Sequence, residues 1–168
     1  GALHNLGVDY TDAATALGAI PNVVKGSEAG TAINSIMRKL TQTSGESSKA
    51  MEALGISMFD TEGNFVGMEE GLWRVHEALD GMSDADRTAY LEHLGGQYYS
   101  ILGNLLDQFD PIEDEQGNVT TGWRELHDEI ADSGGALDQM RDTKLDTLTG
   151  DIDKLTSALE ALENKFFE

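Results

Sequence analysis

The amino-acid sequence predicts an all-α protein: a compact multi-helix domain with one minor β-hairpin, followed by a long C-terminal helix with a heptad pattern. Apolar residues recur at intervals of three and four through most of the chain, which is the spacing of one helix face. Ser, Thr and Gly stand where such helices should begin and end. The longest apolar repeat lies near the C-terminus, so we expect a helical domain over residues 1–132 and an amphipathic, coiled-coil helix over residues 133–168.

The first third of the chain predicts three helices. The first covers residues 10–20, and the second covers residues 27–40 with Ser27 as its cap, because a serine oxygen can accept from the free N–H groups at a helix start. A polar linker leads to a short third helix over residues 47–54. Gly55 suits the position after its end, because glycine takes the left-handed conformation that closes many helices.

The minor hairpin is predicted near residues 56–66. Apolar residues 56–59 and 65–66 flank the turn Asp60-Thr61-Glu62-Gly63-Asn64. A calcium loop is the alternative for these alternating polar side chains, but its glycine should stand sixth and its bidentate acid twelfth. Gly63 stands fourth and Gly71 twelfth, so a hairpin turn is favoured. A ribbon this short is unstable alone and should pack on the helices.

The second half of the chain predicts four further helices, with one connection that is either a loop or a hairpin. Residues 68–79 form the first of these helices, and Ser83 caps the next, which breaks at Gly95-Gly96. Residues 98–109 follow, then residues 111–122, which read as an acidic surface loop or a second hairpin. Thr121 is a candidate cap for a helix over residues 123–130. We expect four large aromatic side chains in the core: Trp73, Tyr98, Tyr99 and Trp123.

Composition excludes several classes of function. The chain has 31 acidic and 11 basic residues, a formal charge of −20, and this charge repels nucleic acid phosphate, so specific binding to nucleic acid is not expected. The absence of cysteine excludes disulfides and thiolate metal sites. No apolar run is long enough for a membrane segment. The chain does not begin with Met, and we interpret it as part of a longer protein.

No residue pattern predicts catalysis, a metal site or a cofactor. The four histidines, His4, His76, His93 and His127, lack the spacing of a zinc-binding helix, and helix surfaces or core margins explain them better. Neither a phosphate-binding loop nor a serine nucleophile elbow is present. We therefore expect that the chain is not an enzyme.

The C-terminal heptads supply the candidate partner-binding residues. Apolar side chains alternate at steps of three and four over three heptads, interrupted by Gly150 at a cost of ~1 kcal/mol relative to Ala. This seam could pack on the preceding domain, or it could self-associate or continue as a coiled coil. The seam consists of Leu145, Leu148, Ile152, Leu155, Leu159, Leu162 and Phe166.

Several sequence segments, in this order and spacing, resemble the core region of phage tail tape measure proteins. The front segments are YTDAATALG at residues 10–18 and KGSEAGTA at residues 25–32. In the middle, LGIS at residues 54–57 precedes the Asp60 turn and MSD at residues 82–84. SGGA at residues 133–136 follows. The acidic stretch around residues 110–122 and the Gly95-Gly96 pair depart from the family pattern.

The resemblance implies a structural role in a phage or prophage: tail tube assembly, tail length determination and genome delivery. It also implies tail tube and tail assembly proteins as partners, and a place in the lumen of the virion tail after assembly in the host cytoplasm. A helix rises ~1.5 Å per residue, so the whole chain would span ~250 Å if fully helical, although its many glycines favour a compact fold. The main alternative function is a helical adaptor or secreted protein-interaction domain without catalysis. An enzyme domain is the other alternative, and it would need a pocket with converging polar groups.

Overall fold

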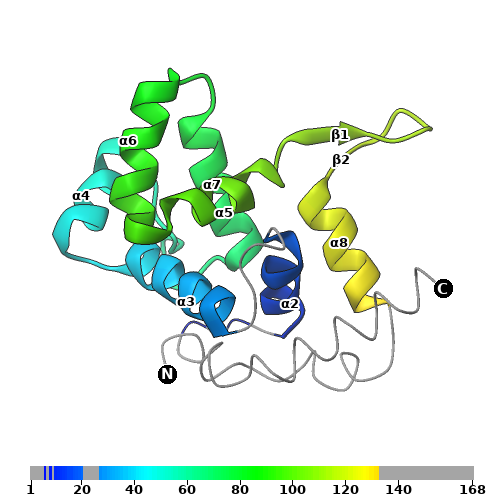
Figure 1. The fold of residues 1–168 in the computed structure, drawn as a ribbon, viewed down its shortest axis with the longest axis horizontal. Helices are drawn as coiled ribbons and strands as arrows, with labels where there is room; N and C mark the ends of the chain where they lie inside the picture. The colour runs from blue at the N-terminus through cyan, green and yellow to red at the C-terminus, as the bar shows by residue number, and fades with distance from the viewer. Residues whose placement is uncertain (1–5, 7, 9, 21–26, 133–168) are drawn as a thin grey trace.

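The computed structural model describes residues 6, 8, 10–20 and 27–132, and these residues are mostly helical (Figure 1). The predicted α-rich class is therefore confirmed. One two-stranded antiparallel sheet accompanies the helices, at residues 111–121 rather than at the predicted position near residues 56–66. The predicted C-terminal helix and its heptads lie outside the described residues. The elements are α2 (Tyr10–Ala19), α3 (Ser27–Thr41), α4 (Gly45–Leu54), α5 (Met68–Leu79), α6 (Asp84–Gly95), the 3-10 helix η1 (Gly96–Tyr98), α7 (Tyr99–Asp107), β1 (Pro111–Glu113), β2 (Val119–Thr121) and α8 (Gly122–Ala131).

Three of the predicted helix boundaries show the expected cap. Ser83 Oγ accepts a hydrogen bond from the Asp86 backbone N–H at 3.2 Å, at the start of α6. Thr121 Oγ1 accepts from the Arg124 N–H at 3.1 Å, at the start of α8. Gly55 closes α4 in the left-handed conformation, with φ at 72°. The local signals in the sequence therefore set these boundaries.

The helices pack around one core. The pairs in contact include α2 with α3, α7 and α8, α3 with α4 and α6, α4 with α6, and α7 with α5 and α6. In Figure 1, α4 and α8 lie at opposite ends of this arrangement. The core consists of apolar side chains from several helices, among them Ile33, Ile36, Met37, Leu72, Val75, Leu94, Leu102, Leu105 and Leu106.

The four aromatic side chains predicted for the core differ in how deeply they are buried. Trp123 is completely buried and its ring stacks on Phe109, with centroids 5.4 Å apart. Trp73 and Tyr98 are partly buried against the core. Tyr99 is 40% exposed, so its predicted core position is wrong. Consecutive helical residues point about 100° apart, and the junction of η1 and α7 turns Tyr98 inward and Tyr99 outward.

Two turns in the chain share one sequence pattern and one geometry. Residues 60–64 read DTEGN and residues 114–118 read DEQGN. In the first turn, the Asp60 carboxylate accepts from the backbone N–H groups of residues 62 and 64, both at 2.9 Å. In the second, the Asp114 carboxylate accepts from those of residues 116 and 118, at 3.0 and 2.8 Å. Gly63 and Gly117 have φ of 84° and 83°, which only glycine adopts readily.

The strands beside these two turns differ. At the predicted hairpin near residues 56–66, the pairing is a single antiparallel bridge, Phe59 to Phe65. Gly67, with φ at 99°, directs the chain into α5 directly afterwards, which leaves no length for a ladder. The sheet forms at the second turn instead, where β1 and β2 pair in antiparallel register, so residues 111–122 are a second hairpin rather than a loop.

Candidate protein-interaction sites

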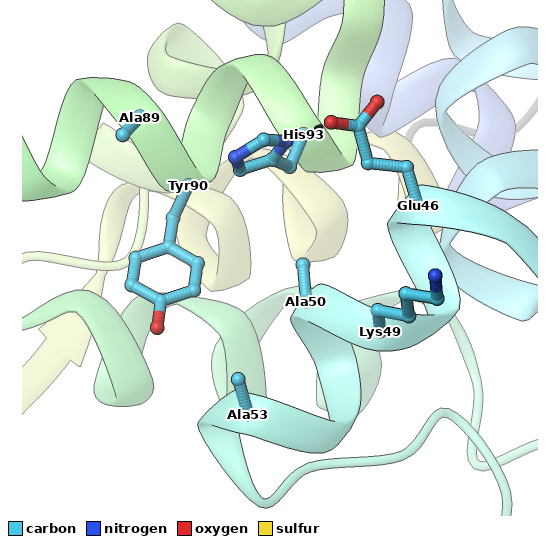
Figure 2. A pocket seen from close by; sticks show the side chains of 7 residues that line it. All are labelled: Glu46, Lys49, Ala50, Ala53, Ala89, Tyr90 and His93. Carbon is cyan, nitrogen blue, oxygen red and sulfur yellow. Dashed lines mark ion pairs between the residues drawn. The ribbon is translucent and has the colours of Figure 1, made fainter.

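A cavity of about 290 Å³ lies between α4 and α6 (Figure 2). Its lining is mainly apolar, and it opens at the surface. Helix α4 contributes Glu46, Lys49, Ala50 and Ala53, and α6 contributes Ala89, Tyr90 and His93.

Small side chains create this cavity. Ala50 and Ala53 stand three residues apart, so they share one face of α4, and Ala89 faces them from α6 (Figure 2). The Tyr90 ring borders the space and is partly buried against the core. The volume is at the lower limit of ligand pockets, which begin at about 300 Å³.

One polar contact crosses between the two helices beside the cavity. His93 Nδ1 on α6 lies 2.7 Å from Glu46 Oε1 on α4 (Figure 2). Both side chains are well exposed, at 45% and 74%, so solvent screens the pair and it contributes little to stability. The relative position of the two helices therefore depends on their packing against each other and against α3, and not on this pair.

A second cavity, of about 300 Å³, is polar and lies where α5 ends, α6 begins and α7 ends. His76 Nε2 lies 2.9 Å from the Asp110 carboxylate, and Arg87 reaches Asp107 at 3.4 Å. Two of the lining carboxylates are therefore engaged by protein side chains. Among the described residues, no three His, Asp or Glu side chains are grouped so that they could hold a metal ion.

An ion pair joins the beginnings of α5 and α8. Arg124 Nη2 lies 2.8 Å from Glu69 Oε1, and Arg124 also reaches Asp128 at 3.4 Å. Partial burial lowers the pKa of Arg124, but the charge of Glu69 and the hydrogen bonds to both carboxylates outweigh this effect and raise the pKa above its ordinary value. The guanidinium therefore stays charged, and its contact with Glu69 links the start of α8 to the start of α5.

The structure describes some of the candidate residues chosen from the sequence, and others lie outside the described residues. The heptad seam, Leu145 to Phe166, lies outside the described residues, as does His4. His76, His93 and His127 occupy partly buried or exposed helix positions, as predicted, and the structure shows in addition that each lies beside a carboxylate. The turn at residues 60–64 is a hairpin turn, because the Asp60 carboxylate accepts backbone hydrogen bonds.

Sequence reasoning missed two surface features. The first is the cavity between α4 and α6, whose signal was the pair of alanines three residues apart. The second is the exposure of two apolar residues on the second hairpin, with Ile112 at 41% and Val119 at 71%. The repeat of the D-x-x-G-N turn predicts a hairpin at both places, but it does not predict this exposure, because the equivalent residues Met58 and Phe65 are covered.

Comparison with known proteins gives two matches that bear on function. A family model described as "Phage-related minor tail protein" matches residues 1–96. The tape measure protein of Pneumococcus phage Dp-1 is 25% identical over 160 residues, an alignment that covers 95% of this chain and 13% of that protein. No solved structure matches significantly. Among the helices that the structure describes, none is both long and apolar enough to cross a membrane.

Proposed function

Because this chain belongs to the family of phage-related minor tail proteins, we propose that it is the part of a tail tape measure protein that contributes to tail tube assembly, tail length determination and genome delivery. The alignment with the Dp-1 tape measure protein carries this proposal, since it spans nearly the whole chain. The chain spans 13% of that relative's length, so the proposed role is one part of a longer protein's work.

The fold is consistent with a structural role. Its polar cavity has two carboxylates engaged by His76 and Arg87, and its apolar cavity offers a docking shape for a side chain. Neither arrangement pairs a nucleophile with a base. We propose that the chain binds other tail proteins, that it resides in the tube lumen of the virion tail, and that it passes through the host cytoplasm during assembly.

We also propose that residues 133–168 form a unit separate from the helical domain of residues 1–132. The heptads give this segment an apolar seam that requires a partner surface, because a lone amphipathic helix of this length is marginal in water. The partner surface is either the domain itself or another copy of the chain.

Peptide mass spectrometry on purified tails tests the proposed function. We expect peptides of this chain in intact tails and a large decrease after the particles have been triggered to release their DNA. Tail tube peptides serve as the internal control, because the tube stays in place. Equal amounts before and after release would contradict the role in genome delivery, and absence from intact tails would contradict the tail role as a whole.

A further inference from the structure

We propose that the second hairpin is a docking arm that inserts into a basic, apolar-lined groove on a protein other than this chain. The docking arm is defined as β1, β2 and the turn of residues 114–118 between them. Figure 1 shows it extending away from the helices. By contrast, the first hairpin, defined as residues 56–66, has Met58 buried in the core and Phe65 packed against it. The inference is independent of the tail role proposed above.

In the first hairpin, the apolar residues on either side of the turn are covered by the helical core. When the two D-x-x-G-N turns are superimposed by sequence, Met58 corresponds to Ile112 and Phe65 corresponds to Val119. Met58 is 1% exposed, and its sulfur approaches α5 so closely that a Cβ at Gly71 would lie 2.7 Å from it. Phe65 is also packed against the core.

The docking arm has apolar residues at the same positions without the same cover. Ile112 is 41% exposed and Val119 is 71% exposed. Burial of such aliphatic side chains stabilises a contact by roughly 25 cal/mol per Å² of apolar surface. Two strands of three residues are also marginal by themselves, so a partner surface would stabilise the ribbon.

The register of the strands indicates a groove rather than a flat surface. Ile112 pairs with Thr120 and Val119 pairs with Glu113. Directly paired residues share a face of a ribbon and successive residues alternate between faces. Ile112 and Val119 therefore lie on opposite faces of the docking arm, and a partner must enclose the ribbon to cover both.

Charge determines the chemistry of the partner. The docking arm carries Glu113, Asp114 and Glu115 next to its apolar residues, and Asp110 stands at its base. A second copy of the chain would add another −20 charge, and residues 145–168 contain more acidic than basic side chains. Both occupants would therefore be repelled, whereas a groove with Lys and Arg beside apolar side chains complements the docking arm.

Photo-crosslinking from position 119 in the full-length parent protein tests the proposal. We would place p-benzoylphenylalanine at Val119, and at Thr61 as the matched control, because Thr61 is exposed on the equivalent turn of the first hairpin. In phage-producing cells we expect a crosslink from position 119, absent from position 61, to a different protein. The crosslinked peptide should contain Lys or Arg together with apolar residues.

A charge reversal completes the test. The double substitution Glu113→Lys and Glu115→Lys should reduce the crosslink yield by about tenfold, because it replaces attraction with repulsion. No crosslink, a crosslink to this chain or to another copy, or a yield unchanged by the charge reversal would overturn the proposal. Absence of the chain from purified tails would overturn the tail role alone, since the crosslink is measured in whole cells.

Discussion

Replacement of Asp60 by Ala should destabilise the protein several times more than replacement of Asp114 by Ala. Both carboxylates accept two backbone hydrogen bonds in turns of the same geometry. Both substitutions also remove one negative charge, so the effect on overall repulsion is matched. The difference lies in what each turn supports, because the first hairpin places Met58 in the core, whereas the docking arm extends away from it (Figure 1).

The magnitude follows from the lost hydrogen bonds. Each contributes about 0.5–1.5 kcal/mol net, and the exposure of the turn favours the lower half of that range. Asp60→Ala should therefore lower the free energy of unfolding by about 1–2 kcal/mol, or the Tm by roughly 2–8 °C for a chain of this size. Asp114→Ala should change the free energy of unfolding by less than about 0.5 kcal/mol, because the docking arm can fray without opening the core.

Urea unfolding of the 168-residue chain, followed by circular dichroism, measures both effects. Asp60→Asn is the control, because the amide retains one acceptor oxygen and should recover most of the lost stability. Equal decreases for the two Ala variants would refute the reasoning, since they would show that the docking arm is coupled to the core as strongly as the first hairpin.

Three further predictions concern the core, the C-terminal seam and the net charge. Trp123→Ala should lower the free energy of unfolding by about 3–5 kcal/mol in urea titrations, because the indole is completely buried on Phe109, and a loss below about 1 kcal/mol would contradict that packing. Leu155→Asp combined with Leu159→Asp should reduce helicity or the sedimenting mass while residues before Gly122 stay folded; unchanged values of both would exclude a packing role for the seam. Added NaCl should raise the Tm, because screening weakens the repulsion within a chain of charge −20, and a steady fall with salt would show that favourable ion pairs dominate.

Local signals in the sequence predicted the helices well. Ser83, Thr121 and Gly55 each act at the helix end to which they were assigned, because a cap depends on only a few neighbouring residues. The apolar periodicity likewise identified the buried faces of α3, α5 and α7, since a helix repeats every 3.6 residues whatever it packs against.

Features that depend on tertiary contacts could not be predicted in the same way. The exposure of Tyr99 results from the direction in which η1 joins α7. The spacing of apolar residues could not show which of Tyr98 and Tyr99 is buried. The first hairpin is reduced to one bridge because Gly67 begins the path into α5 so early. The alanine pair of α4 indicates a helix face with small side chains, but the cavity forms only where this face meets α6, and the sequence does not show that the two helices are in contact.

The length of the tail is the measurement that tests the proposed tape measure role most directly. An in-frame duplication of these 168 residues within the parent gene should lengthen the tail, as measured by electron microscopy of the virions. The increase should lie between about 40 Å, the diameter of a compact domain of this size, and about 250 Å, the span of a continuous helix. Tails of unchanged length, containing the duplicated protein, would contradict the account.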